Sequence, residues 1–122
     1  MAIEITYDVT GTEEFKAAME QFDSGMQQQV HEQLRKWAAD VKVSAMQRVP
    51  VKTGHLRRSI YAKVGEWVAE VGADAVYAMA VELGTRYMRA RPFLFSAFQE
   101  SLPQLEAIIG EAIETAKREA GL

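Results

Sequence analysis

The stretch SGMQQQVHEQLRKWAADVKVSAMQR, residues 24–48, decides the fold of this 122-residue chain. Its apolar side chains recur at steps of three and four residues, at Met26, Val30, Leu34, Trp37, Val41 and Ala45. This spacing places them in one stripe on an α-helix, so the stretch predicts a long amphipathic helix. The helix is expected to stop near Arg48, because Pro50 disfavours helical geometry at the residue before it.

On the N-terminal side of this helix, the sequence predicts one strand and one short helix. Residues 3–9, IEITYDV, alternate apolar and polar side chains, as a half-buried strand does. Thr12 can cap a short helix that runs to about Phe22, with Glu13 and Glu14 in the first turn, where the helix dipole favours carboxylates. The sequence DSG at residues 23–25 then predicts a turn or kink.

On the C-terminal side, residues 60–72, IYAKVGEWVAEVG, predict a β-hairpin whose bend lies near Gly65 and Glu66. The following residues, 73–84, fit either a strand or a helix. We favour a short helix from about Val76 to Leu83, with Gly84 in the left-handed conformation that often ends a helix.

After Pro92 the chain is expected to be helical to its end, and Pro103 either kinks this segment or begins a second helix. Its stripe is Leu105, Ile108, Ile109, Ala112, Ile113 and Ala116. We expect Leu34, Trp37, Ile109 and Ile113 to be buried. The predicted fold class is therefore α+β, a single domain over residues 1–122 with a small, mostly antiparallel sheet packed against two long α-helices.

The composition excludes several classes of protein. The chain has no cysteine, which excludes disulfides, thiolate zinc sites and a cysteine nucleophile. We see no signal peptide, and no stretch approaches the roughly 20 apolar residues of a membrane span, so no membrane partner is expected. The net charge is −3, yet residues 48–64 hold five cations and no acid. Such a basic segment can contact phosphates or an acidic protein face, or be neutralised within the fold.

Catalytic signatures are absent from the sequence, so neither an enzyme nor a cofactor is expected. The two histidines are His31, off the apolar stripe and expected to be exposed to solvent, and His55, beside a cluster of cations. No HExxH motif, acidic metal loop or glycine-rich phosphate loop occurs.

Two loops remain, RVPVKTGHLRRSI at residues 48–60 and VELGTRYMRARPF at residues 81–93. In the first loop, the candidate residues for contact with a partner or DNA are Lys52, Arg57 and Arg58. In the second, Glu82 could pair with Arg86 four residues later, but one exposed pair does not explain three arginines. The candidate protein-interface residues are Arg86, Arg89, Arg91 and Phe93, because arginines with aromatic residues are typical of protein interfaces. The same combination is also found in grooves that bind single-stranded nucleic acid.

These loops carry a family resemblance. VPVKTGHLRRSI resembles the V-P-V-x-T-G-x-L-R-x-S-I signature of a family of tail components from long-tailed double-stranded DNA bacteriophages and prophages. VYAMAVELGTRYMRARPFLFSAF resembles the family's second signature, Y-A-x-x-V-E-x-G-T … M-x-A-R-P-F-L-x-x-A. The matching positions are Pro50, Thr53, Gly54, Leu56, Arg57 and Ser59, then Tyr77, Val81, Glu82, Gly84, Thr85, Met88, Arg91, Pro92 and Phe93. One departure is Met79, where the family frequently has proline.

The resemblance implies a structural virion protein of tail completion or head–tail joining, without enzyme activity or cofactor. It implies that the partners are further copies of the chain, possibly arranged in a ring, and other tail or connector proteins. Its location would be the virion, and the host bacterial cytoplasm during assembly. A ring on the path of the packaged DNA would tolerate non-specific contact with DNA. The alternative prediction, from another class, is a small nucleic-acid-binding module that uses the basic segment 48–64.

Overall fold

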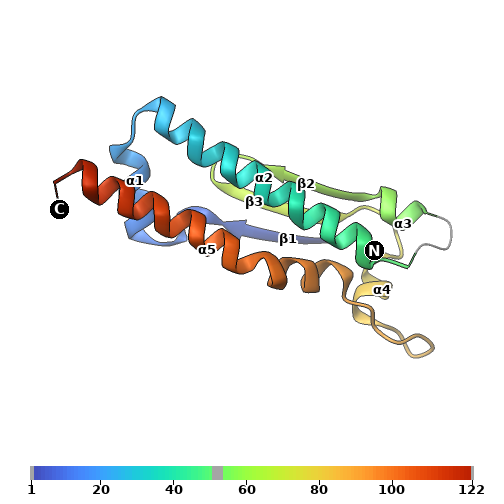
Figure 1. Cartoon of the computed structure of the whole chain (residues 1–122). Coiled ribbons are helices and arrows are strands. Elements are labelled where there is room, and N and C mark those ends of the chain that lie inside the picture. Colours follow the sequence, from blue (N-terminus) through green and yellow to red (C-terminus); the bar gives the residue numbers. More distant parts are fainter. Residues whose placement is uncertain (1, 51–53, 122) are drawn as a thin grey trace.

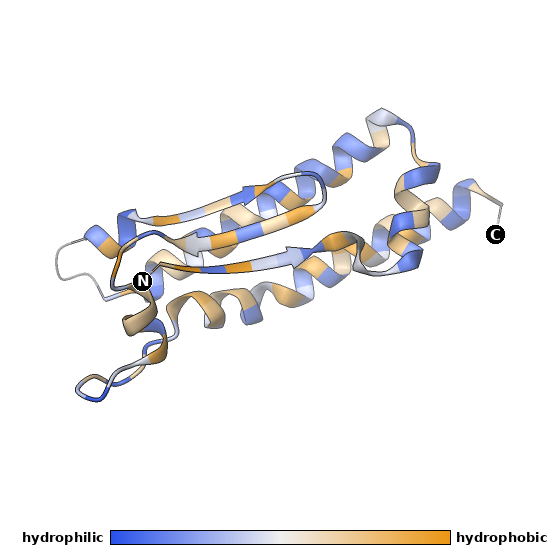
Figure 2. Cartoon of the chain, turned by 180° about the vertical axis from the view of Figure 1, so that it is seen from behind, coloured by the Kyte–Doolittle hydropathy of each residue, from blue (hydrophilic) through white to orange (hydrophobic). Residues whose placement is uncertain are grey.

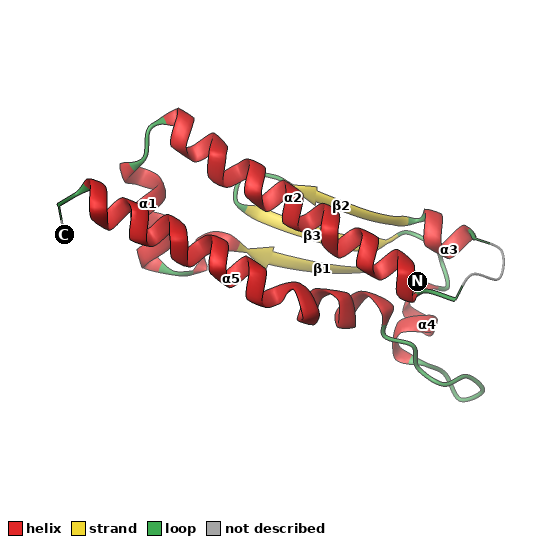
Figure 3. Ribbon diagram, in the orientation of Figure 1, coloured by secondary structure: helices red, strands yellow, loops and turns green. Residues whose placement is uncertain are grey.

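The computed structural model describes residues 2–50 and 54–121. In chain order its elements are β1 (Ile3–Asp8), the 3-10 helix η1 (Val9–Gly11), α1 (Glu13–Gln21), α2 (Ser24–Arg48), α3 (His55–Arg58), β2 (Ile60–Val64), β3 (Val68–Ala73), α4 (Ala78–Leu83) and α5 (Phe93–Glu119). A three-stranded sheet with two long helices confirms the predicted α+β class (Figure 3).

The sheet has the strand order β1-β3-β2, and both of its strand pairs are antiparallel. The long helices α2 and α5 lie side by side over one face of it and form the second layer (Figure 1). Side chains alternate between the two faces, as the change of hydropathy along β1 illustrates (Figure 2). Ile60, Ala62 and Val64 share a face, and Val71 of β3 is buried on that face, while Val68 is only half-buried.

The core lies between the sheet and the two long helices. On α2 the predicted stripe is buried except for Met26, which is half-buried; Leu34 is fully covered and Trp37 is 3% exposed. The expectation that Ile109 and Ile113 are also buried is wrong, because both are half-buried at the edge of the core. In this part of α5 the buried positions are the small side chains of Ala112 and Ala116, which permit close approach of the neighbouring helices.

Side chains at the helix ends explain the boundaries. The Thr12 hydroxyl caps α1 as predicted, accepting a hydrogen bond of 3.3 Å from the Phe15 amide. Asp23 lies in the predicted turn and also caps α2, because its carboxylate accepts a bond of 2.9 Å from the Met26 amide. α5 continues through Pro103 as one helix, so no second helix begins there.

The region that was ambiguous in sequence is helical, but α4 starts at Ala78 rather than near Val76. Gly84 follows it with φ 80° and ψ 170°, so its φ is positive as expected, while its ψ is extended rather than left-handed helical. A Cβ atom on Gly84 would lie 2.7 Å from the Ala90 amide nitrogen. Both the backbone angles and this close approach therefore require glycine.

Candidate functional site

The exposed apolar side chains gather at one end of the molecule. Of the seven large hydrophobic residues exposed in the described chain, six belong to residues 76–95, namely Val76, Tyr77, Leu83, Tyr87, Met88 and Phe95. These residues belong to the segment just before α4, to α4, to the loop after it and to the start of α5, which lie at the end of the molecule that also carries α3 (Figure 1). A contiguous group of exposed apolar side chains is typical of a surface that contacts another molecule.

The loop after α4 is a short β-hairpin, which we call the tip hairpin (residues 85–88). The Thr85 amide donates to the Met88 carbonyl at 2.8 Å, and the Met88 amide donates back to Thr85 at 3.3 Å. The Thr85 hydroxyl also accepts a bond of 3.2 Å from the Tyr87 amide. These bonds place Arg86 and Tyr87 at the turn, where the Tyr87 side chain is 89% exposed.

The base of the tip hairpin is fixed by a buried carboxylate. Glu82 is 4% exposed, and its two oxygens accept hydrogen bonds from the Leu94 amide at 2.9 Å and the Phe95 amide at 3.3 Å. These amides lie in the first turn of α5, where backbone N–H groups lack helical partners and the helix dipole favours a negative charge. The possible ion pair between Glu82 and Arg86 is therefore not formed, because the Glu82 side chain points inward and bonds to the start of α5. The N-cap residue of α5 is Pro92, whose side chain has no hydrogen-bond acceptor.

The predicted interface residues divide into two groups. Arg86, Arg89 and Arg91 are exposed, and their guanidinium groups have no hydrogen-bond or ion-pair partner within the described part of the chain. Arg91 is held by its backbone instead, because its amide donates to the Val81 carbonyl at 2.8 Å. Phe93 is 2% exposed and belongs to the core, so it does not lie on the surface of this chain as expected. The exposed aromatic residue of this helix start is Phe95, at 51%.

The other predicted loop contributes its arginines to the same end. Gly54 has φ 76°, which explains why glycine suits the start of α3, and Leu56 anchors α3 in the core. Arg57 and Arg58 are both exposed. Lys52, the third residue predicted for this surface, lies outside the described residues, as does Thr53.

A ring contact brings α3 and the start of α4 together. The imidazole of His55 and the ring of Tyr77 are 6.0 Å apart, so the first loop lies beside the segment that leads into the second. The exposed arginines predicted in the two loops therefore lie at the same end of the molecule, namely Arg57, Arg58, Arg86, Arg89 and Arg91. Other cations of the basic segment are neutralised locally: Arg48 pairs with Glu100, and Lys63 lies 3.1 Å from Glu70. The basic character of residues 48–64 is therefore reduced in the fold.

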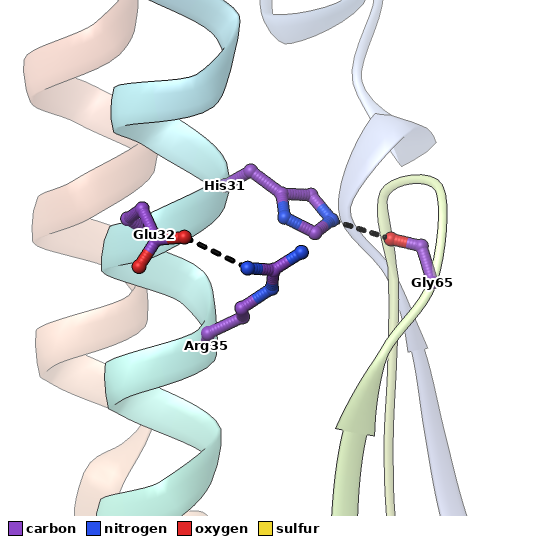
Figure 4. A network of polar contacts seen from close by, with 4 residues as sticks. All are labelled: His31, Glu32, Arg35 and Gly65. Atoms are coloured by element: carbon purple, nitrogen blue, oxygen red, sulfur yellow. Dashed lines mark hydrogen bonds and ion pairs between the residues drawn. The ribbon is translucent and has the colours of Figure 1, made fainter.

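A second surface feature is an open groove of about 690 Å³ between α2 and the turn that joins β2 to β3. His31 lines it and is half-buried, which corrects its expected exposure to solvent. Its Nε2 lies 2.9 Å from the Gly65 carbonyl (Figure 4). Its ring also packs edge-on against Trp67. Beside it, Arg35 pairs with Glu32 at 2.7 Å. His31 is thus bonded to the turn, and Arg35 to its neighbour on α2.

The described residues contain no group of three or more His, Asp or Glu side chains placed to hold a metal ion. Within the same residues, no helix is both long and apolar enough to cross a membrane. What remains is a compact α+β body with an exposed end of arginines and aromatic side chains. An exposed end of this composition is typical of the class of structural proteins that contact other proteins.

Comparison with known families identifies the particular one. Residues 13–84 match the HK97-gp10-like family, described as "Bacteriophage HK97-gp10, putative tail-component", and the chain belongs to this family. The resemblance stated from the two loops is thereby confirmed. No curated protein and no solved structure matches the chain. The matched segment runs from α1 to Gly84, so it includes the first loop and the helix that carries Glu82, and it stops just before the tip hairpin.

Proposed function

We propose that this tail component acts in tail completion or head–tail joining, and that it does so by self-assembly and by contacts with neighbouring virion proteins. The end of the molecule that carries α3, α4 and the tip hairpin is the contact surface. The protein would then reside in the virion, and in the host bacterial cytoplasm while particles assemble.

The observation that carries this proposal is the contrast between a rigid base and an exposed tip. Glu82 and the Arg91 amide hold both ends of the loop, while the side chains of Arg86, Tyr87 and Arg89 extend from it without internal partners in the described chain. A preorganised loop loses little conformational entropy on binding, and arginine and tyrosine are enriched among the residues that dominate interface energies.

The test is complementation of a phage that lacks the gene with the Arg86→Ala/Arg89→Ala protein. We expect folded protein by circular dichroism and particles whose heads and tails remain unjoined in electron micrographs. The matched control is Lys16→Ala/Lys36→Ala, which removes the same charge from exposed helix positions elsewhere. Normal infectious particles with the arginine variant would contradict the proposal, and an unfolded variant would assign the arginines to the fold.

The alternative is a nucleic-acid-binding module that uses the basic segment 48–64. It is favoured by one observation, the gathering of five exposed arginines at one end. Binding of this kind weakens steeply with salt, because each phosphate contact releases counterions. Titration of the purified chain with DNA at several salt concentrations distinguishes the two. Strong, salt-dependent binding that is lost in Arg57→Ala/Arg58→Ala would favour the module, whereas no binding at low salt would leave the joining function.

A further inference from the structure

Within the described residues, β1 and β2 are the outer strands of the sheet, and neither pairs with a further strand on its outer edge. In an antiparallel pair, every second residue has its backbone N–H and C=O bonded to the neighbouring strand. Ser59 bonds to Asp74 just before the β2–β3 ladder and Gly65 bonds to Val68 just after it, which fixes which residues of β2 bond to β3. The odd-numbered residues bond to β3, so the N–H and C=O groups of Ile60, Ala62 and Val64 point away from the sheet. An unpaired edge of this kind is a template for another strand.

The edge of β1 follows from the same reasoning. The Val9 amide donates to the Trp67 carbonyl at 2.8 Å, which continues the ladder between β1 and β3. Bonding positions alternate from there, so Ile3, Ile5 and Tyr7 face β3. The backbone groups of Glu4 and Thr6 therefore point outward from the opposite edge of the sheet.

A groove of about 360 Å³ accompanies the free edge of β2, between this strand and α2. Its apolar lining includes the small side chains of Ala38, Ala39 and Ala62, and its cations are Arg35, Lys42 and Lys63. Arg35 and Lys63 have intramolecular ion pairs, whereas Lys42 has none within the described residues. Room beside small side chains, next to a free strand edge, suits an incoming strand that carries apolar residues on one face and acids on the other.

Strand β1 of a second copy has this character. Its inward side chains, Ile3 and Ile5, are only half-buried in a single chain, and Glu4 and Asp8 occupy the outer face. β1 and β2 also run in the same direction, since both are antiparallel to β3. A copy that keeps its orientation would therefore place its β1 parallel to β2.

The faces of the two strands agree with a parallel pair. In a parallel ladder, a bonding residue on one strand bonds to the two neighbours of the residue directly opposite it on the other strand. The bonding residues of the two strands therefore have their side chains on opposite faces of the sheet. The outward-bonding residues of β2 have side chains toward the helices, and those of β1 have side chains on the outer face. A parallel β1–β2 contact therefore continues the sheet and keeps the helices of both copies on the same side.

Charge distinguishes this contact from a two-fold symmetric one. Two β2 edges placed together would bring Lys63, Lys42 and Arg35 of both copies face to face, and two β1 edges would oppose their acids. The β1–β2 contact instead sets Lys63 beside the acidic outer face of β1. Opposite charges on neighbouring strands are favourable and like charges are not.

We infer that the free edge of β2, with the groove beside it, receives strand β1 of a second copy of this chain in parallel orientation. This is a head-to-tail contact, which uses different surfaces on the two copies and so generates a ring or an open filament rather than a closed pair. It rests on the proposed self-assembly, but it uses a surface distinct from the tip hairpin.

Because the chain has no cysteine, single-cysteine variants can test the contact directly. Thr6→Cys and Lys63→Cys place thiols on the exposed outer faces of β1 and β2. The two purified proteins are mixed at increasing concentration and treated with a short bismaleimide cross-linker. We expect a linked dimer in the mixture and only background in either variant alone. The control mixture pairs Lys63→Cys with Glu106→Cys, an exposed position on α5.

Ala62→Pro sharpens the test, because it removes an outward N–H that makes no bond within the sheet. One lost hydrogen bond should weaken the linking roughly three- to tenfold. If this variant fails to fold, Thr6→Pro removes an equivalent outward N–H from β1 of the full-length protein. In that protein the cysteine of β1 is placed at residue 8, as Asp8→Cys, instead of at residue 6. Linking of Lys63→Cys with itself, equal linking with the α5 control, or no linking at any concentration would overturn the inference.

The outcome is separable from that of the tip hairpin. Adding Arg86→Ala/Arg89→Ala to the cysteine variants should leave the cross-linking yield unchanged. Normal infectious particles from the arginine variant, together with normal cross-linking, would reject the role of the hairpin alone. Absent cross-linking together with unjoined particles from the arginine variant would reject the strand contact alone.

Discussion

Two tight turns of this molecule are closed in a similar way and have opposite surroundings. The turn between β2 and β3 is closed by a bond of 2.9 Å from the Gly65 amide to the Val68 carbonyl, and the tip hairpin by a bond of 2.8 Å from Thr85 to Met88. Each has an aromatic residue at its second central position. Trp67 packs against the rings of Phe15 and His31 at 6.0 and 5.6 Å, whereas Tyr87 is 89% exposed.

The difference separates residues that maintain the fold from residues that are available for contacts. Trp67 has φ 64°, an unusual conformation for a residue with a Cβ atom, and its ring contacts offset the cost of roughly 1–2 kcal/mol. The Tyr87 ring has no aromatic or hydrogen-bond partner within the described residues. A large side chain that contributes little to folding is consistent with a role in binding.

Loss of the anchored aromatic should have the largest effect on stability. Trp67→Ala removes two ring contacts and leaves a positive φ on alanine, so we expect the free energy of unfolding to fall by about 3 kcal/mol. Urea denaturation followed by circular dichroism measures it. Trp67→Gly is the control and should be about 1 kcal/mol more stable than Trp67→Ala, because glycine adopts a positive φ freely. Equal stability of the two variants would contradict the role of backbone strain.

The next largest effect should come from the glycine at the base of the tip hairpin. Gly84→Ala places a Cβ against the Ala90 backbone at φ 80°, and we expect a loss of about 2 kcal/mol in thermal or chemical unfolding. Gly110→Ala is the matched control within α5, where a Cβ meets nothing within 4 Å. That substitution should stabilise the protein by about 0.5–1 kcal/mol, so losses in both variants would count against our explanation.

Removal of the buried carboxylate should have a smaller effect. Glu82→Ala leaves the Leu94 amide without its acceptor, and we expect the free energy of unfolding to fall by about 1.5 kcal/mol. Hydrogen exchange at the Leu94 and Phe95 amides should also become faster. Glu82→Gln keeps an acceptor oxygen and should lose about half as much. Unchanged exchange in the alanine variant would show that other groups hold the start of α5.

The smallest effect on folding should come from the exposed aromatic. Tyr87→Ala should change the free energy of unfolding by about 0.5 kcal/mol or less, since the side chain is almost fully in solvent. The same variant should impair joining in the complementation assay, as the proposed contact surface requires. A large loss of stability would place Tyr87 with Trp67 as a residue of the fold and remove the contrast between the turns.

The elements of the fold could be predicted because their signals are local. The 3.6-residue period of α2, the alternation in β1 and the cap at Thr12 depend on residues within a few positions of one another. The glycine-containing bend likewise indicated the β2–β3 hairpin. The sequence around Pro103 is consistent with a kink or with the start of a second helix, because proline lacks the N–H that would continue the helical bonding. Whether the helix continues through it depends on packing against neighbouring elements.

The candidate site could be predicted only in part. Composition indicates the arginines of both loops, but the four-residue spacing between Glu82 and Arg86 suggests only a possible local ion pair for the carboxylate of Glu82. Its observed partners are 12 and 13 residues away, on α5. No pattern in the sequence gives the orientation of α4 relative to α5, which depends on the packing of both against the core.

The sequence by itself determined the long helices and the strands, and that two loops rich in arginine and aromatic residues lie among them. It did not reveal α3, and it left residues 73–84 open between strand and helix. The tertiary structure decided which side chains those loops expose. Phe93 and Phe95 are separated by about 200° around α5, so one faces the core and the other faces solvent, and the run FLF cannot indicate which. His31 lies off the stripe of α2, yet a distant turn covers it. Secondary structure follows from neighbours along the chain, whereas exposure follows from contacts between segments far apart in sequence.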